Sequence, residues 1–266
     1  MTYRVSQAAE VPPGVSAAAA LPTGVSGNPE PQVGDEVVVL LLADVAPAWR
    51  LWGWWRIMRG GQSFRSVPGL RFAKALGSGF EGGFGLRPSR SRQGVFAVFD
   101  NEAAADRFIA KSPTLAAFRA RSTELCVAKL RAWSSRGAWS GQTLQPSAPA
   151  PMASQGAVPV AALTRASIQP RRALAFWRKA PPAQQSLAQA PGCWLAVGLG
   201  EAPLLRQATF SVWESVGAMD AYARSGAHLD AIRAAMREGY FSESMFARFV
   251  PVALYGCWNG TVYEGP

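Results

Sequence analysis

The chain has 266 residues, 49% of them hydrophobic, and a formal net charge of +10. This composition excludes a wholly disordered chain and allows one large domain or two of ordinary size. No run of residues reaches the eighteen apolar positions that a membrane-spanning helix requires. The basic excess favours anionic partners, which are phospholipid headgroups, nucleic acid or an acidic protein.

The basic residues are scattered, and clusters such as Arg87–Arg92 are typical of a solvated loop. No motif that reads nucleic acid accompanies them, so we expect no nucleic-acid partner. The three cysteines, Cys126, Cys193 and Cys257, show no CxxC spacing, which indicates a reducing compartment. Met1–Glu36 lacks the basic start and apolar core of a signal peptide, so we expect a cytoplasmic protein.

Residues 1–35 are rich in Pro, Gly, Ala and Ser. They cannot bury enough apolar surface to offset the entropy of ordering, so we predict a disordered N-terminal extension. Residues 144–159 have a similar composition and are predicted to be a linker. These two segments leave a first unit at residues 36–143 and a second unit at residues 160–266.

The first unit is predicted to contain four strands, at Glu36–Val45, Leu70–Leu76, Gly94–Phe99 and Glu124–Trp133. Between them we expect helices over residues 48–59, about 101–110 and 113–120. A proline precedes or opens the first and third of these helices, and Asp100 or Asn101 can cap the second.

The second unit is predicted to repeat this order. Its strands are expected at Val160–Ile168, Gly192–Leu199, Leu205–Trp213 and Ser244–Val252. Helices should begin at Pro170 and at Glu214 or Ser215, and a further helix at Ala227–Glu238 should end at Gly239 in a left-handed cap. Both units finish on related tails, GAWSG at residues 137–141 and GCWNG at residues 256–260.

Part of this repeat is visible residue by residue. Gly94–Ala120 aligns without a gap to Ala208–Ala234 with eight identities in 27 positions, where about three are expected by chance. The order strand–helix–strand–strand–helix–strand is ferredoxin-like (βαββαβ), and its sheet leaves one face free of helices. We therefore predict an α+β fold in which two tandem ferredoxin-like repeats form an internal pseudo-dimeric α+β barrel. Two separate domains are the alternative.

The alignment places His228, the only histidine, opposite Thr114. Helical spacing puts His228, Ile232 and Ala235 on one stripe, so the imidazole should face the sheet. It is either a hydrogen-bonded core histidine or a ligand of haem iron in an apolar pocket. One histidine and separated cysteines argue against a structural zinc site, and a two-histidine iron site is excluded within one chain. The chain has no GxSxG motif of a serine hydrolase.

Three other features have competing interpretations. Residues 77–82 match GxGxxG, but the glycine-rich run after them cannot open a helix, so we expect a loop and no dinucleotide. Trp49–Trp55, flanked by arginines, either packs on its own sheet through Trp49 and Trp52 or lies at a membrane interface. A cysteine thiolate is a rival iron ligand, although inert buried thiols are the favoured interpretation.

Long runs of the chain resemble the spheroidene monooxygenase family, the carotenoid ketolases of purple bacteria. In the second unit these runs are residues 200–213 (GEAPLLRQATFSVW), 219–228 (MDAYARSGAH) and 239–249 (GYFSESMFARF). In the first unit, Gly83–Pro88 and Gly94–Asp106 also fit. The resemblance covers about residues 36–262 and leaves the N-terminal extension outside it.

The resemblance implies a haem-dependent monooxygenase that oxidises carbon 2 of spheroidene, through a hydroxyl, to a ketone. It also implies molecular oxygen as co-substrate, reduced ferredoxin as electron donor, and peripheral attachment to the inner or photosynthetic membrane. Together with the repeat, it makes His228 the expected catalytic residue and haem-iron ligand. Arg165, Arg206 and Arg248 are candidates to pair with the haem propionates. A non-catalytic protein that binds an apolar ligand and a cofactor-free oxygenase are the alternatives.

Overall fold

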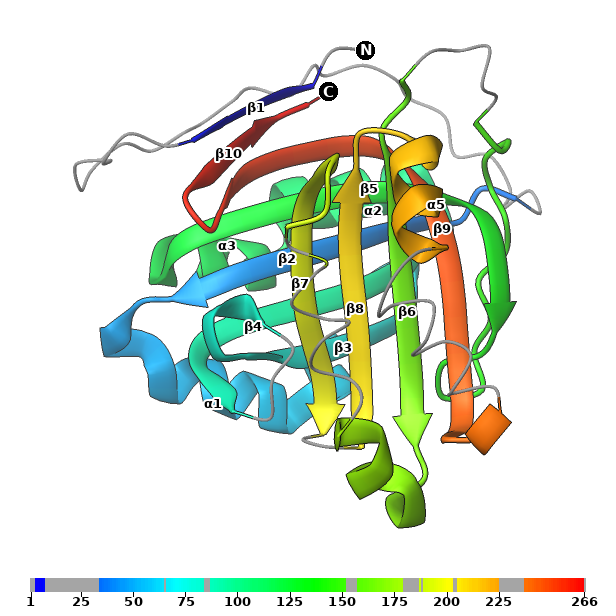
Figure 1. Ribbon diagram of the computed structural model, residues 1–266. Coiled ribbons are helices and arrows are strands. Elements are labelled where there is room, and N and C mark those ends of the chain that lie inside the picture. The colour runs from blue at the N-terminus through cyan, green and yellow to red at the C-terminus, as the bar shows by residue number, and fades with distance from the viewer. Residues whose placement is uncertain are drawn as a thin grey trace.

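The computed structural model describes residues 3–7, 34–64, 66–83, 87–151, 157–178, 187, 189–202, 205–224 and 237–265. Its strands form a single antiparallel sheet that closes on itself, because β9 pairs with both β5 and β6. Eight strands make the closed barrel, in the order β9-β5-β2-β4-β3-β7-β8-β6. Two short strands, β10 and β1, continue from β9 beyond the barrel (Figure 1).

The eight barrel strands come equally from the two halves of the chain. The first half supplies β2 (Val37–Val45), β3 (Leu70–Gly79), β4 (Pro88–Phe99) and β5 (Ser122–Gly137). The second supplies β6 (Val160–Ile168), β7 (Cys193–Ala202), β8 (Arg206–Trp213) and β9 (Phe241–Trp258). Both halves have the same strand order, fourth–first–third–second, and they join through the pairs β5–β9 and β3–β7.

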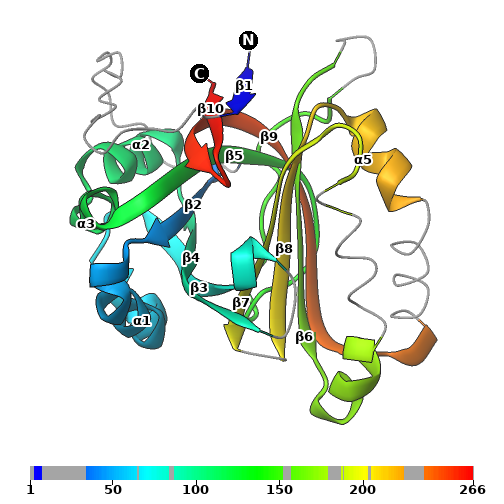
Figure 2. The same ribbon diagram turned by 60° about the vertical axis from the view of Figure 1, so that its left-hand side comes forward.

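The helices lie outside the barrel. On the first half these are α1 (Arg50–Arg59), α2 (Glu102–Lys111) and α3 (Pro113–Arg121), with the short 3-10 helices η1 (Pro47–Trp49), η2 (Gly60–Phe64) and η3 (Phe80–Gly82). The second half has η5 (Pro170–Arg172), helical residues 173–178 and α5 (Val216–Ala223). Figure 2 shows α1, α2 and α3 on one side, α5 on the other, and the barrel strands between them.

Three helices begin at capping side chains, two of which, Asn101 and Ser215, lie where the sequence predicts a helix start. Asn101 accepts a hydrogen bond from the Ala104 N–H at 3.0 Å, and Ser112 accepts one from Thr114 at 3.1 Å. Ser215 caps α5 in the same way, through Ala218 at 3.2 Å. Each cap satisfies one of the N–H groups that a helix leaves without a partner at its start.

Apolar side chains form two layers about the strands of the first half. Residues such as Leu40 and Phe96 point into the barrel, where they meet Leu163, Phe210 and Phe249 from the second half. The alternate residues point outward and are covered by side chains of α2 and α3, among them Phe108, Ile109, Leu115 and Phe118. Because a strand's side chains alternate between its faces, each strand separates an inner from an outer core.

The predicted α+β class and the closed barrel with external helices are confirmed. Three local predictions are wrong. Arg87–Arg92 is not a solvated loop, because β4 begins at Pro88 and Arg92 pairs there with Asp44 of β2. The GxGxxG run is not a loop, since Gly77–Gly79 belong to β3 and Phe80–Gly82 form η3.

The third wrong prediction concerns only the start of the N-terminal extension, since residues 8–33 of it lie outside the described residues. Arg4–Gln7 form β1, which pairs with β10 (Thr261–Glu264), and the Tyr3 hydroxyl donates to the Pro251 carbonyl at 2.8 Å. An open sheet edge binds a strand through backbone groups, so composition does not reveal the pairing. The predicted linker is also held at its start, where Leu144 is buried and the Ser147 hydroxyl donates to the Glu36 carbonyl.

The two related tails have matching backbones. Gly137 and Gly256 have φ of 82° and 103°, Ser140 and Asn259 have 53° and 52°, and Gly141 and Gly260 have 74° and 70°. Ser140 and Asn259 are the only non-glycine residues with positive φ in the described chain. Trp139 and Trp258, the central residues of the tails, are both at most 1% exposed.

Candidate active site

The expected iron ligand, His228, lies outside the described residues. The chain is described up to Arg224, just after α5, and again from Arg237. Residues 237 and 238 are helical, and Gly239 directly after them has φ of 59°. This confirms the predicted left-handed cap. In the sequence this segment connects α5 to β9, two elements that the structure describes.

The outer face of the second half is lined by small side chains. Across β6, β8 and β7, Ala162 and Ala196 both lie opposite Ser211, while Thr164 and Gly198 both lie opposite Thr209. These residues are buried or half-buried. We call these six residues the small-residue face: Ala162, Thr164, Ala196, Gly198, Thr209 and Ser211.

Three of the six equivalent positions of the first half are bulkier, while the other three hold alanine (Ala73, Ala75 and Ala97). Val39, Leu41 and Val95 stand where the second half has Ala162, Thr164 and Thr209, in the same strand register. They pack directly against α2 and α3. Larger aliphatic side chains fill the space between a sheet and its helices, whereas Ala, Gly and Thr leave more of it open. A glycine inside a strand often marks a place where a ligand comes close to the backbone.

Arg165 lies on the inner face of the barrel and is 2% exposed. Its guanidinium binds two carboxylates, Glu201 at 3.3 Å and Glu243 through a short ion pair. Glu201 also accepts from Lys74 Nζ at 2.9 Å and from Trp139 Nε1 at 2.6 Å. Arg165 thus belongs to a buried network that closes one end of the barrel.

The carboxylates of this network stay ionised despite their surroundings. Burial alone would raise the pKa of Glu201, but hydrogen bonds from Lys74 and Trp139 hold that pKa below its usual value. Burial also opposes ionisation of Glu243, whose pKa is lowered by the backbone N–H groups of Gly141 and Ser140 and by Arg165. The network is therefore charged and internally compensated at neutral pH.

The three candidate arginines do not converge. Arg206 begins β8 and is exposed, with an inward register like that of Ala208 and Phe210. Arg248 points to the outer face, where it binds Asp220 of α5 at 3.1 Å. Arg165 and Arg248 therefore lie on opposite faces of the same sheet, so a single haem cannot reach all three arginines. Only Arg248 shares its face with the small-residue face.

The cysteines are thiols in this fold. Burial raises the pKa of Cys193 to about 12 and that of Cys257 to about 11, and it raises the pKa of the fully buried Cys126 further. A thiol with so high a pKa carries almost no thiolate at neutral pH. Within the described residues, no group of three or more His, Cys, Asp or Glu side chains is placed to hold a metal ion.

Helix α1 has one face that packs on its own sheet and another that exposes apolar side chains to solvent. Trp52 packs edge-on against Phe118 at 5.1 Å, as expected for a helix resting on its own sheet. Leu51, Trp55 and Met58 point outward and are 87%, 53% and 82% exposed. The expectation that Trp49 also faces inward is wrong, because it is 44% exposed. No described helix is long and apolar enough to cross a membrane.

Known proteins identify the family. No protein-family model matches the chain. Spheroidene monooxygenase of Rubrivivax gelatinosus is 57% identical over 235 residues, which are 88% of this chain and 90% of that protein. The chain belongs to the spheroidene monooxygenase family. A family member from Rhodobacter capsulatus is 38% identical over 195 residues, or 73% of this chain and 80% of that protein. Membership makes the protein an enzyme of the monooxygenase class.

Solved structures share the fold. An aldoxime dehydratase superposes with a TM-score of 0.55 at 13% identity, covering 88% of this chain and 86% of that chain. A second, in complex with butyraldoxime, has a TM-score of 0.53 at 10% identity, with 87% and 83% covered. At these identities the likeness concerns the architecture of this spheroidene monooxygenase family member, not its chemistry.

Proposed function

We propose that the protein introduces a keto group at carbon 2 of spheroidene-type acyclic carotenoids by two O2-dependent hydroxylations, with haem as cofactor and reduced ferredoxin as electron donor. The name of its relatives supports the substrate and the reaction class. The small-residue face is the structural observation that carries the proposal, because Ala162 and Thr164 stand where the first half has the larger Val39 and Leu41.

The described residues of the small-residue face fit a haem. A porphyrin is flat and mostly apolar, and Ala162, Ala196 and Gly198 would let it approach the sheet closely. Haem, when bound, supplies the activation of molecular oxygen. In this proposal His228 holds the iron, and Arg248, on the same sheet face, pairs with a propionate. Arg165 and Arg206 lie on the inner face, and we assign Arg165 to the stability of the barrel.

The protein's own side chains then exclude water and orient the group that pairs with the propionate. The buried apolar side chains Trp213 and Met219, beside the small-residue face, keep water from the apolar end of a carotenoid. The Asp220 carboxylate orients Arg248 and compensates part of its charge.

We also propose that the two halves are tandem ferredoxin-like copies, residues 36–143 and 160–266. Their identical strand orders and matching tails support this origin. In this view one copy kept large outer side chains and became a packed scaffold. The other acquired small side chains and His228, and so became the catalytic copy.

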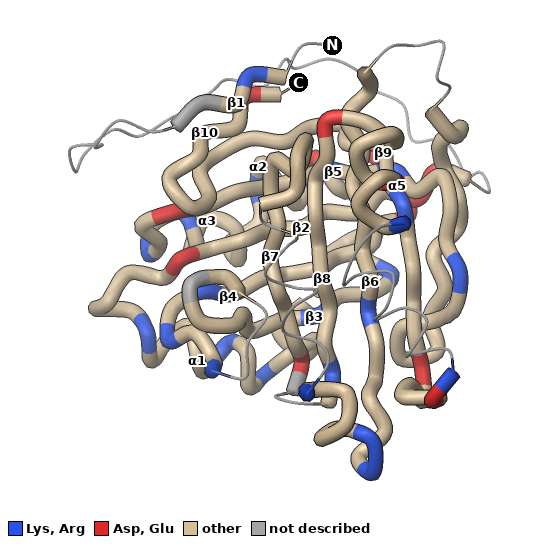
Figure 3. The backbone as a smooth tube through the Cα atoms, in the orientation of Figure 1, with Lys and Arg blue, Asp and Glu red and all other residues tan. Residues whose placement is uncertain are grey.

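Peripheral membrane contact through α1 is part of the proposal. The substrate is a hydrocarbon that dissolves in lipid, and Leu51, Trp55 and Met58 expose apolar surface beside Arg56 and Arg59. Apolar side chains inserted at headgroup depth, with arginines on the phosphates, are typical of interfacial helices. Figure 3 shows basic residues along α1, all of which are arginines. Basic surface of this kind also suits an acidic ferredoxin.

The function is tested by producing the protein in a bacterium that accumulates spheroidene and separating its carotenoids by chromatography. The proposal predicts conversion to the 2-hydroxy compound and then to the 2-ketone, dependent on oxygen. Spheroidene that stays unchanged in cells containing soluble protein and a ferredoxin would contradict it. A non-catalytic carotenoid carrier would instead co-purify with unmodified pigment.

A further inference from the structure

The two ends of the barrel are built from equivalent residues, but their hydrogen-bonding groups are not equally satisfied. At one end, Trp139 donates its indole N–H to Glu201, as described above. At the other end stands Trp258, the equivalent residue of the second tail, 1% exposed. Its Nε1 is buried and has no hydrogen-bond partner among the described residues. Buried N–H groups without a partner are rare, and here the described part of the chain supplies no acceptor.

One difference between the halves explains why Trp258 has no acceptor like the one that Trp139 has. Gly77 and Gly200 lie opposite each other where β3 meets β7, and the next residues along the chain are Ser78 and Glu201. Ser78 therefore occupies the position that Glu201 has at the other end. Its hydroxyl donates to the Gly198 carbonyl at 2.7 Å. Trp258 thus lacks the carboxylate that receives the hydrogen bond of Trp139.

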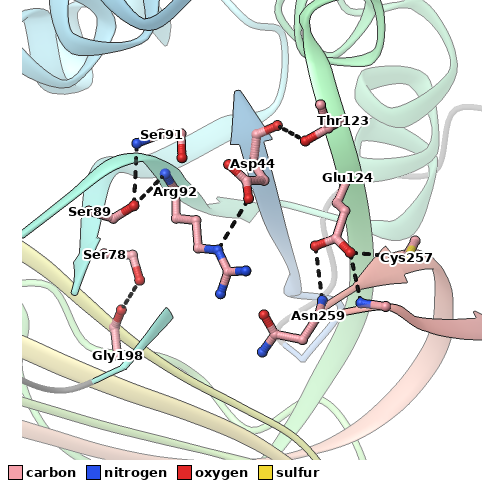
Figure 4. Close-up of polar contacts among 11 residues, drawn as sticks. Asp44, Ser78, Ser89, Ser91, Arg92, Thr123, Glu124, Gly198, Cys257 and Asn259 are labelled. Atoms are coloured by element: carbon pink, nitrogen blue, oxygen red, sulfur yellow. Dashed lines mark hydrogen bonds and ion pairs between the residues drawn. The ribbon is translucent and has the colours of Figure 1, made fainter. Parts of the chain in front are cut away.

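A second buried donor borders the same place. Arg92 donates through Nε to Asp44 at 3.2 Å, while its Nη1 is buried and has no partner in the part of the chain that the structure describes. The guanidinium carbon lies 5.2 Å from the centre of the Trp258 ring. In Figure 4 the Arg92 guanidinium lies between Ser78 and Asn259, and its one dashed line runs to Asp44.

Gly82 keeps the space beside these two donors open. A Cβ atom at this position would lie 2.9 Å from Arg92 Nη1 and 3.5 Å from the Cζ2 atom of Trp258. Gly82 also has φ of 76°, which a side chain rarely tolerates. The backbone therefore passes close to both donors without filling the space next to them.

On one side of Arg92, the end of the barrel that holds Trp258 carries an excess of positive charge. A hollow of about 530 Å³ beside Arg92 is lined by three further arginines, Arg50, Arg87 and Arg90, and by one carboxylate, Asp44. On the other side of the Arg92–Asp44 pair lies Glu124, whose oxygens already accept from the N–H groups of Asn259 and Gly260. An anion is thus favoured on the arginine-lined side.

We propose that this end of the barrel binds an oxyanion, a phosphate or carboxylate group, whose oxygens accept from Arg92 Nη1 and Trp258 Nε1. The bound group occupies the place that the Glu201 carboxylate fills at the opposite end. It can belong to a free ligand or to a phospholipid headgroup, since Trp54 of α1 lines the same hollow. Only the headgroup source depends on the membrane contact proposed above.

The indole N–H resonance of Trp258 in a ¹H–¹⁵N NMR spectrum reports on the site directly. Titration with inorganic phosphate and with acetate should move this resonance in a saturable way. Trp258→Phe keeps an aromatic ring but removes the donor, and it should weaken binding about tenfold or more, as expected for a hydrogen bond to a charged group. Trp139→Phe is the matched control, because that indole already binds Glu201; it should leave the affinity unchanged.

Ser78→Glu tests the symmetry argument by supplying the missing carboxylate from the chain. This variant should lose phosphate binding while its Trp258 resonance moves toward the position seen in the phosphate-bound protein. If Ser78→Glu does not fold, Gly82→Ala tests the site without the symmetry argument: its Cβ would lie 2.9 Å from Arg92 Nη1 and should weaken phosphate binding.

Vesicles then distinguish the two sources. A Trp258 shift with phosphatidylglycerol vesicles but not with soluble anions assigns the site to a lipid headgroup, and a shift with soluble phosphate assigns it to a free ligand. Absence of a saturable shift with phosphate, acetate and vesicles would overturn the proposal. So would equal loss of binding in Trp139→Phe and Trp258→Phe.

Discussion

Glu124 and Glu243 each bind the turn that follows the last barrel strand of the opposite half. Glu124, on β5, accepts from the N–H groups of Asn259 and Gly260 at 2.9 and 2.7 Å. Glu243, on β9, accepts from Gly141 at 2.9 Å. The two glutamates hold the halves together reciprocally, at opposite ends of the barrel, and they give the turns Ser140–Gly141 and Asn259–Gly260 the same backbone.

Removing either glutamate should therefore destabilise the fold. Glu124→Ala is expected to lower the free energy of unfolding by about 1–2 kcal/mol, as for other charged hydrogen bonds. Glu243→Ala should cost about 3 kcal/mol, because it also leaves the buried Arg165 with one carboxylate fewer. Urea unfolding measures both values. Because the sites are far apart, the double variant should show the sum. A larger loss for Glu124→Ala, with Glu264→Ala as the exposed control, would contradict this ranking.

Stability should fall in acid because of the buried network. The pKa values of Glu201 and Glu243 are lower in the folded protein than the ordinary value of 4.5. The unfolded chain then binds more protons than the native protein just below pH 4.5, so the free energy of unfolding rises with pH through that window and levels off above it. Urea unfolding between pH 3 and 6 measures the slope. Glu201→Gln should make it shallower, and an unchanged slope would show that Glu201 gains no proton on unfolding.

The small-residue face yields a prediction about cofactor binding. Ala162→Val combined with Thr164→Leu gives the second half the side chains of Val39 and Leu41. The double variant should fold, with a change in stability of about 1 kcal/mol or less, but should bind much less haem because the added methyl groups fill the space over the sheet. Haem content per protein and circular dichroism measure the two effects. Full haem content in the folded double variant would place the cofactor elsewhere.

The membrane contact of α1 can be tested with exposed residues alone. Leu51→Ser and Met58→Ser should each weaken binding to phosphatidylglycerol vesicles by about three- to tenfold, since each removes apolar surface that would enter the lipid. Both side chains are over four-fifths exposed, so the fold should be unaffected. Leu174, 67% exposed on the other half, is the matched control. Cosedimentation in which Leu174→Ser has the same effect as Leu51→Ser would contradict a specific α1 contact.

Much of the fold is predictable because local signals agree with it. Asn101, Ser112 and Ser215 are residue types that favour the start of a helix, and each caps one here. The alternation of apolar residues along the strands indicates an inner and an outer core. Long-range pairing is not visible in this way. The strand at Arg4–Gln7 depends on the free edge of β10, and Arg92 joins a strand because Asp44 lies opposite.

The candidate site is only partly predictable for the same reason. Arg165, Arg206 and Arg248 share a residue type, but strand register decides that Arg165 faces inward and Arg248 outward. The small-residue face spans three strands, so it emerges only when their register is known. Sequence comparison of the halves could have revealed it, since Val39 and Leu41 align with Ala162 and Thr164.

The central claim is that His228 ligates a haem in the second half of the barrel. The most direct measurement is the absorption spectrum of freshly purified protein, as isolated and with dithionite, for the wild type and for His228→Ala. The account predicts a Soret band that shifts on reduction in the wild type, is lost in His228→Ala, and returns when imidazole is added to the variant. A colourless wild-type protein that still converts spheroidene, or an unchanged band in His228→Ala, would contradict it.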